Sequence, residues 1–236
     1  EKSDVTGTIK HFATNNQEHR RHFVESVVSE RALREIYLRG FEIAVKEGHP
    51  RSIMSSYNLV NGTYANENKH LLMEILRGEW GFDGAVITDW GGSNDHALGV
   101  KNGSTLEMPA PGGDSVRELL AAVESGKITE SDIDARLSEL LPLVFDTKAA
   151  LDAAPREFDA AAHHALARRA AEESLVLLKN EGALLPLAAG TKVAVIGDFA
   201  KNPRYQGAGS SMVNSTQVDV LLDKLIDSEL NVIGYQ

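Results

Sequence analysis

The sequence predicts an α/β fold in two parts, about half of a parallel β/α barrel followed by the beginning of a second α/β unit. Short apolar runs alternate with amphipathic helical segments throughout the first part, and this alternation is typical of parallel βα units. About four such units are present, whereas a parallel barrel closes with eight strands. An open half barrel would leave unpaired strand edges, so we expect further strands upstream.

The elements of the first part follow from the spacing of their apolar residues. Period-two or continuous apolar runs indicate strands, and apolar residues three and four apart indicate one buried face of a helix. The expected strands are 8–12, 52–57, 85–89 and 106–108, and the expected helices are 29–46, 67–77, 115–124 and 129–141. The last helix begins with a capping-box-like run at 129–132.

Helix ends are indicated by residues that satisfy or terminate the backbone. Ser29 and Asn66 are expected N-caps, because their side chains accept hydrogen bonds from free N–H groups. Gly48 and Gly126 fall where a helix ends in a left-handed residue. Pro142 is expected to end or kink the last helix of the first part.

The second part is shorter and begins after an expected linker. Residues 147–162 are assigned to this linker, because the run 147–158 is rich in alanine and interrupted by Pro155. An Ala-rich helix and two apolar runs, 175–178 and 193–196, then open a second α/β unit. A doubly wound domain usually needs about 100 residues or more, so we expect the second domain, residues 163–236, to be incomplete here.

Composition excludes several classes of partner. Thirty-four acidic residues against 24 basic ones leave a net charge of −10, without a basic stripe. Nucleic acid is therefore not an expected partner, and an uncharged substrate fits better. No apolar stretch approaches the roughly 20 residues of a membrane span, so no membrane association is expected. The absence of cysteine excludes disulfides and thiol chemistry.

Cofactors and location are less constrained. The loop 206–211 lacks the ending of a P-loop, 196–199 lacks the spaced glycines of a dinucleotide site, and no spacing recommends a metal. We therefore expect no cofactor. Residues 1–7 carry no signal-peptide pattern but read as the middle of a domain. A cytoplasmic location is favoured over a secreted one, while an upstream leader and a homo-oligomer stay open.

Polar or aromatic residues stand at the ends of four successive expected strands. The carboxyl ends of parallel strands meet at one edge, so these side chains are expected to converge on one cavity. Each residue alone has a simpler interpretation: a lysine at the surface, a histidine in the core, an aspartate in a turn. The residues are Lys10 and His11, Met54 and Tyr57, Asp89 and Trp90, and Glu107 with Met108.

Asp89 is the strongest candidate. It ends the short apolar run of Ala85, Val86 and Ile87, whose burial would fix the backbone, and Trp90 follows with a flat face on which a sugar ring could stack. A carboxylate at a fixed strand end beside a sugar-sized cavity is the arrangement of a nucleophile in a barrel enzyme.

Several motifs, in their order and spacing, closely resemble those of the family 3 glycoside hydrolases. They are Lys10-His11-Phe12-Ala-Thr-Asn-Asn-Gln-Glu18, Ser29-Glu-Arg-Ala-Leu-Arg-Glu-Ile-Tyr37, Met54-Ser-Ser-Tyr57-Asn, Leu76-Arg-Gly-Glu-Trp-Gly-Phe-Asp-Gly84, Thr88-Asp-Trp-Gly-Gly92, Glu173-Ser-Leu-Val-Leu-Leu-Lys-Asn180 and Gln206-Gly-Ala-Gly-Ser-Ser211. The resemblance implies the C-terminal half of a (β/α)8 TIM-type barrel over residues 1–146, followed by the beginning of an α/β sandwich domain over residues 163–236.

The resemblance also implies roles for individual residues. Asp89 maps onto the family's nucleophile, and Lys10 with His11 onto the pair that holds sugar hydroxyls. Met54 and Tyr57 map onto residues that line the same subsite, next to Trp90. In the second part, Ser210 and Ser211 would lie near the cleft, with Ser210 as a candidate substrate contact.

Two departures limit what the resemblance implies. The family's general acid/base, a glutamate further along the sandwich domain, lies outside this chain, as do an aspartate and an arginine of the first half of the barrel. The N-acetylglucosaminidase branch places a histidine in the motif that begins with Lys-His-Phe. Here that run reads Lys-His-Phe-Ala-Thr-Asn-Asn, which disfavours that branch.

The expected function is that of a retaining, exo-acting β-glucosidase acting on small oligosaccharides or on aryl and alkyl β-glycosides, completed by the remainder of the same polypeptide. Two alternatives remain open at this stage. One is a β-xylosidase or a glycosidase of mixed specificity, because contacts to the exocyclic hydroxymethyl group are not visible in the sequence. The other is a catalytically silent, sugar-binding relative that has lost the acid.

Overall fold

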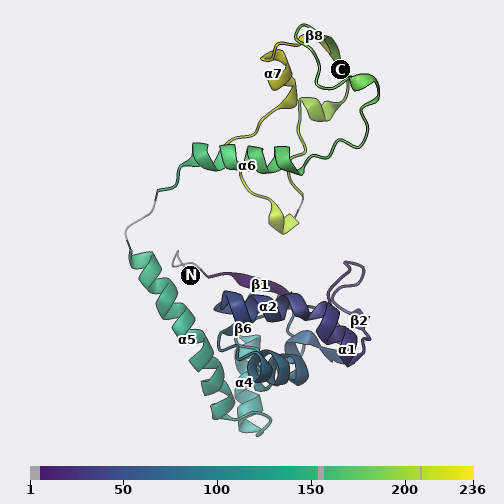
Figure 1. Cartoon of the computed structure of the whole chain (residues 1–236). Coiled ribbons are helices and arrows are strands. Elements are labelled where there is room, and N and C mark those ends of the chain that lie inside the picture. Colours follow the sequence, from purple (N-terminus) through teal and green to yellow (C-terminus); the bar gives the residue numbers. More distant parts are fainter. Residues whose placement is uncertain (1–5, 154–156, 208) are drawn as a thin grey trace. The chain divides into compact units, whose positions relative to one another are not determined.

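The computed structural model describes residues 6–153, 157–207 and 209–236, and it divides the chain into two compact units, residues 1–156 and 157–236. Figure 1 shows the elements of each unit. Pro155, which interrupts the expected linker, lies outside the described residues. The two units are described separately below.

A parallel sheet forms the centre of the first unit. It contains β1 (Thr8–Phe12), β3 (Ser52–Ser55) and β6 (Ala85–Ile87), in the order β1-β3-β6. Leu106 extends the sheet through an isolated parallel bridge to Ile87, so the expected strand at 106–108 contributes one bridge only. Four chain segments therefore end at the same edge of this sheet.

Helices follow the strands in the βα order that the sequence predicts. The expected helix 29–46 is present in three consecutive pieces, and the segment 67–77 becomes a helix of π type that starts three residues later. The helices are α1 (Glu30–Ala32), η1 (Leu33–Tyr37), α2 (Arg39–Gly48), η3 (His70–Glu79), α3 (His96–Lys101), α4 (Asp114–Glu124) and α5 (Glu130–Asp152). Short α3 was not predicted. α5 contacts β6 and α3.

The first unit also contains a small second sheet. It contains β2 (Glu25–Ser26), β4 (Leu59–Val60) and β5 (Thr63–Tyr64), followed by the 3-10 turn η2 (Ala65–Glu67). β2 pairs in parallel with β4, and β4 pairs with β5 as a tight hairpin. This sheet joins the loop after β1 to the loop after β3.

The apolar faces of these helices pack on the parallel sheet. Phe12 at the end of β1 makes edge contacts with the rings of Phe41 and Trp80, at centroid distances of 5.1 and 5.9 Å. Burial of each leucine-sized side chain contributes roughly 1.5–3 kcal/mol. The buried cluster comprises Phe12, Ala13, Leu33, Leu38, Val45, Ile53, Val60, Ala65, Leu71, Leu72, Ile75, Leu76, Phe82 and Val86.

Three of the predicted helix ends are confirmed. The Ser29 hydroxyl accepts a hydrogen bond from the N–H of Ala32 at 3.3 Å, as expected of an N-cap. Thr129 and Asp132 form a complete capping box at the start of α5. Gly126 is left-handed, with φ of 74°.

Two predicted helix ends are wrong. Asn66 is fully buried in η2, and Asn68 caps the following helix instead, its side-chain oxygen accepting from the N–H of Leu71 at 3.1 Å. Gly48 belongs to α2, and the left-handed residue after it is His49, with φ of 46°. At Asn66, the hydroxyls of Ser55 and Ser104 bind the side chain in the interior, and local capping preferences do not include such contacts.

The end of the first unit also differs from the prediction. α5 does not end at Pro142 but continues to Asp152, so residues 147–152 of the expected linker are helical. Alanine and leucine in this stretch have high helix propensity, which sustains the helix after the single hydrogen bond that proline removes. The next helix begins at Ala160, capped by Asp159.

The second unit contains a two-stranded parallel sheet of β7 (Lys192–Val195) and β8 (Asn231–Tyr235). Its other elements are α6 (Ala160–Ser174), η4 (Glu181–Ala183), η5 (Asp198–Ala200), η6 (Gly209–Ser211) and α7 (Leu221–Ile226). The apolar run 175–178 does not form a strand: its three leucines and one valine are 62–91% exposed. No strand among the described residues pairs with them. A segment without a pairing strand cannot form the hydrogen bonds between strands that define a sheet.

None of the helices in the described part of the chain is both long enough and apolar enough to cross a membrane.

Candidate active site

The carboxyl ends of the three strands bring His11 and Asp89 together. Nε2 of His11 lies 3.3 Å from Oδ2 of Asp89. β1 and β3 align Phe12 with Ser55, and β3 and β6 align Met54 with Ile87. Parallel pairing in this register brings the end of β1 and the end of β6 to the same edge of the sheet, as the sequence predicted.

The backbone at the end of β6 holds Asp89 in place. The hydroxyl of Thr88 accepts from the N–H of Met108 at 2.8 Å and donates to its carbonyl at 3.1 Å, joining β6 to the neighbouring segment. Asp89 Oδ1 accepts from the N–H of Trp90 at 2.8 Å. The Asp89 side chain is 14% exposed, so its carboxylate is both accessible and restrained, as a nucleophile requires.

Gly92 closes a tight turn three residues after Asp89. The carbonyl of Asp89 accepts from the N–H of Gly92 at 2.8 Å. A Cβ atom on Gly92 would lie 3.1 Å from that carbonyl oxygen and 3.4 Å from the ring of Tyr57. A side chain at position 92 would therefore crowd this turn.

Tyr57 links the end of β3 to the segment that carries Asp89. Its hydroxyl donates to the carbonyl of Trp90 at 2.8 Å. Burial of the phenol, reinforced by the negative charge of Asp89, raises the pKa of Tyr57 above its ordinary value. The hydroxyl therefore stays protonated and keeps its role as a donor.

Two residues of the loop after β1 contact Tyr57 and were not among the predicted site residues. The guanidinium of Arg21 lies 5.0 Å from the centre of the Tyr57 ring, and the imidazole of His22 lies 4.1 Å from it. Arg21 also pairs with Glu18 at 2.9 Å. The basic run at residues 20–22, directly after the first strand-end motif, was the available sequence signal.

His11 is partly buried, and this determines its charge. Desolvation lowers the pKa of His11; the Asp89 carboxylate opposes this effect, whereas the positive charges of Lys10 and Arg21 add to it. The imidazole is therefore neutral at neutral pH. It offers one donor and one acceptor nitrogen, the pair of functions that binds a sugar hydroxyl well.

The other predicted residues occupy different positions around this edge. Lys10 is exposed next to His11, and Met54 is half-buried in β3. Trp90 is 53% exposed, so part of its ring is accessible to a ligand. Ser210 lies in η6 of the second unit, so its relation to these residues is not defined.

Glu107 and Met108 were predicted to enter the same cavity, and the structure gives them other contacts. Glu107 interacts with the hydroxyl of Ser115 at the start of α4 and lies 3.7 Å from Nδ1 of His96 in α3. Met108 is bonded through its backbone to Thr88. These contacts attach the helices to the end of β6.

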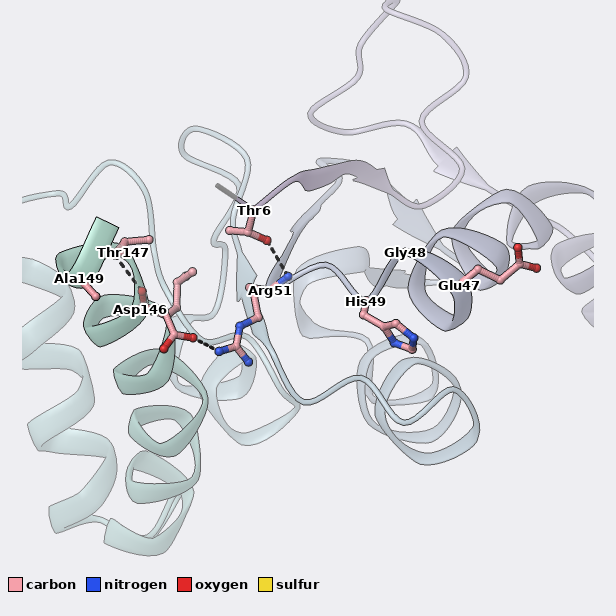
Figure 2. A pocket seen from close by; sticks show the side chains of 9 residues that line it. Thr6, Glu47, Gly48, His49, Arg51, Asp146, Thr147 and Ala149 are labelled. Carbon is pink, nitrogen blue, oxygen red and sulfur yellow. Dashed lines mark hydrogen bonds and ion pairs between the residues drawn. The ribbon is translucent and has the colours of Figure 1, made fainter. Parts of the chain in front are cut away.

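A hollow of about 580 Å³ lies at the opposite end of the strands and is lined by no predicted site residue. Figure 2 shows Arg51 in it, paired with Asp146, while its backbone N–H donates to the hydroxyl of Thr6 at 2.9 Å. Thr6 and Arg51 precede β1 and β3, so this is the amino-terminal edge. In barrels, residues at that edge serve stability.

Among the described residues, no group of three or more histidine, aspartate or glutamate side chains is arranged to hold a metal ion.

Comparison with known proteins identifies the family. Residues 1–143 match the glycosyl hydrolase family 3 N-terminal domain, and residues 175–230 match the family 3 C-terminal domain. The chain is 45% identical over 223 residues to thermostable beta-glucosidase B of Acetivibrio thermocellus, which covers 94% of this chain and 29% of that protein. It is 44% identical over 232 residues to an exo-alpha-(1->6)-L-arabinopyranosidase of Bifidobacterium longum, covering 94% of this chain and 30% of that protein.

A solved structure agrees with these matches. The family 3 beta-glucosidase of Bifidobacterium adolescentis superposes with a TM-score of 0.89 at 41% identity, over 98% of this chain and 34% of that one. The fold is thus part of a TIM-type barrel followed by the start of an α/β sandwich, as the sequence predicted. The chain spans about 30% of the length of the curated relatives it matches. This chain belongs to glycosyl hydrolase family 3.

Proposed function

We propose that the polypeptide carrying this chain is a retaining, exo-acting β-glucosidase that removes terminal, non-reducing β-D-glucosyl residues. The single observation that carries the proposal is the Asp89 carboxylate, held at the end of β6 with His11 at 3.3 Å and the exposed ring of Trp90 beside it. Beta-glucosidases among the family relatives support the same reaction.

The reaction proceeds in two displacements. A carboxylate oxygen of Asp89 attacks the anomeric carbon, the bond to the departing oxygen breaks, and a carboxylic acid outside this chain gives that oxygen its proton. The glycosyl ester on Asp89 is then attacked by water, which the same group, now a carboxylate, deprotonates. The second displacement releases the sugar and restores both carboxyl groups, with net retention at the anomeric carbon.

The remaining residues hold the sugar. Lys10 and His11 bind hydroxyl groups, and these bonds strengthen as the ring distorts toward the transition state. Met54 and Tyr57 line the same subsite, and Trp90 provides a stacking surface. Ser210 of the second unit is proposed as a further contact from the sandwich domain.

Specificity for glucose is open to a competing proposal. Exo-alpha-(1->6)-L-arabinopyranosidases stand among the relatives at 44% identity, and a pentopyranose lacks the exocyclic hydroxymethyl group. A β-xylosidase or mixed-specificity glycosidase therefore remains the second candidate. A sugar-binding relative without catalysis is the third, because the acid lies outside these residues.

We also propose that the other barrel strands and the general acid belong to the remainder of the same polypeptide, because the chain covers 29% of a relative of this kind. The proposed partners are small oligosaccharides or aryl and alkyl β-glycosides, with no nucleic acid, no membrane and no cofactor. A homo-oligomer and a cytoplasmic location are compatible with this proposal.

The test uses the full-length polypeptide. A 2-deoxy-2-fluoro-β-glucosyl reagent should form a stable ester, and peptide mass spectrometry should find it on the peptide containing Asp89. Initial rates on matched aryl β-glucoside, β-xyloside and α-L-arabinopyranoside then rank the sugars. Label on another carboxylate would refute the mechanism, a preference for a pentoside would refute glucosidase specificity, and sugar binding without turnover would favour the silent relative.

A further inference from the structure

A buried carboxylate holds the far end of the segment that begins at the nucleophile. Glu67, the last residue of η2, is 5% exposed. Its Oε1 atom accepts hydrogen bonds from the backbone N–H groups of Asn94 and Asp95, at 2.9 and 2.6 Å. The chain between Asp89 and Asp95 is therefore fixed at one end by β6 and at the other end by Glu67.

The middle of this segment has little rigidity of its own. It contains the adjacent pair Gly91 and Gly92, and Gly91 is left-handed with φ of 74°. Glycine lacks the Cβ that restricts other residues, so such a turn adopts one conformation only when outside contacts select it. The N–H of Gly91 donates to Met108 at 3.0 Å, and Glu67 supplies the next contacts along the chain.

Glu67 is itself held in place by the sheet. The side-chain oxygen of the preceding Asn66 accepts from the hydroxyls of Ser55 in β3 and of Ser104, both at 2.9 Å. The carbonyl of Glu67 accepts from the side-chain amide of Asn102 at 2.8 Å. Through these hydrogen bonds, Glu67 connects the segment 89–95 to β3, the strand that also leads to Tyr57.

Stability alone does not account for a carboxylate at this position. Burial disfavours the charged form and raises the pKa of Glu67, against the effect of the two backbone N–H groups; the carboxylates of Asp95 and Glu118 raise it further. A neutral side chain would avoid this desolvation cost. A charge retained there gives stronger and shorter hydrogen bonds to the loop.

We propose that Glu67 is a positioning residue for the glycosidase reaction: through Asn94 and Asp95 it holds the segment after β6 so that Asp89 and Trp90 keep the orientation needed for attack. This inference rests on the proposed role of Asp89 as nucleophile. Misplacement of a reacting group by about 1 Å costs up to about a hundredfold in rate, so the effect belongs to the chemical step more than to sugar binding.

The experiment compares variants of the full-length polypeptide in their reaction with the 2-deoxy-2-fluoro-β-glucosyl reagent. Glu67→Ala should lower the first-order trapping rate constant by about tenfold to a hundredfold, with little change in the reagent's dissociation constant. Glu67→Gln should recover part of the rate, because its amide oxygen accepts from the same N–H groups but lacks the charge that strengthens those bonds. Glu118→Gln in α4 is the matched control: its carboxylate accepts from the backbone N–H of Ala97 in α3 at 3.3 Å, and the trapping rate of this variant should be unchanged.

The outcomes separate this inference from the proposed function. An Asp89 that is not labelled in the parent polypeptide would overturn both. A labelled parent with parental trapping rates in a folded Glu67→Ala variant would overturn the positioning role and leave the function intact. If the alanine variant does not fold, Glu67→Asp retains the charge but shortens the side chain, and a parental rate in that variant would equally overturn the inference.

Discussion

Nε2 of His11 lies 3.3 Å from Oδ2 of Asp89, although the two residues come from different strand ends. Burial lowers the pKa of His11 against the opposing charge of Asp89, so the contact is between a neutral imidazole and a carboxylate. A protonated imidazole at this distance would attract the electrons that a nucleophile must give to the anomeric carbon. A neutral ring does not draw charge away from the carboxylate, which the proposed role of Asp89 as the nucleophile requires.

Replacement of Asp89 tests covalent catalysis. Asp89→Asn in the full-length polypeptide removes the attacking oxygen's charge while preserving the shape of the side chain. Turnover of an aryl β-glucoside should fall by about three orders of magnitude or more. Asp83→Asn, an exposed change just before β6, serves as the control. An Asp89 variant with near-parental turnover would exclude this residue as the nucleophile.

Lys10 is expected to act on the sugar. Lys10→Ala should reduce kcat/KM by about 2 kcal/mol or more, close to thirtyfold, if its ammonium makes a charged hydrogen bond in the transition state. Lys69→Ala, which also removes an exposed lysine, should have no such effect. Steady-state kinetics and thermal melting distinguish the two roles, since unchanged kinetics with a lower Tm would assign Lys10 to the fold.

The Tyr57 hydroxyl should matter through its bond to the carbonyl of Trp90. Tyr57→Phe retains the ring contacts with Arg21 and His22 but removes the 2.8 Å hydrogen bond. We expect kcat/KM to fall by about 1 kcal/mol, between fivefold and tenfold. Tyr64→Phe, which removes a tyrosine hydroxyl from the small sheet, serves as the control variant. A Tyr57→Phe variant with parental kinetics would show that the bond does not affect the site.

A buried charge network should dominate the stability of the first unit. Glu139 in α5 bonds Arg77 at 2.7 Å and Arg136 at 2.5 Å, and burial lowers the pKa of Arg77 to about 10. Glu139→Gln would leave two buried guanidinium groups without a counter-charge, so unfolding free energy should fall by about 3–5 kcal/mol. Asp134→Asn, exposed on the same helix, should change it little. Urea unfolding measures the stability of both variants. A Glu139→Gln midpoint equal to that of Asp134→Asn would contradict the prediction.

The surface cluster around His70 should make stability weakly pH-dependent. His70 contacts Glu74 at 2.7 Å and Glu30 at 3.1 Å, and these carboxylates raise its pKa; Arg34 and Glu79 complete the cluster. A raised folded pKa means stabilisation that is complete below the ordinary histidine pKa and is lost as pH rises through the folded value. Because the imidazole is exposed, the effect should stay below about 1 kcal/mol.

His70→Gln provides the measurement, because the chain contains other histidines that titrate in the same range. The difference in unfolding free energy between the parent and this variant should be larger at about pH 5 than at about pH 8. A constant or inverted difference would show that the two carboxylates do not stabilise the protonated ring.

Local sequence signals determined the strands and the candidate residues at their ends. The continuous apolar run of Ala85, Val86 and Ile87 places these residues inside the sheet and Asp89 at its end, because a strand buried on both faces carries apolar residues at successive positions. The capping box at Thr129 is equally local, since its partners lie three residues apart. Such features need no knowledge of distant parts of the chain.

Contacts between residues far apart in the chain were decided only by the tertiary structure. Asn66 has the chemistry of an N-cap, but the hydroxyls of Ser55 and Ser104 bind it in the interior, and Asn68 caps the helix instead. Packing likewise brings Arg21 against Tyr57. A polar side chain forms a hydrogen bond with whichever partner folding places within reach. Burial makes that bond necessary, because a buried polar group without a partner costs about 1–3 kcal/mol.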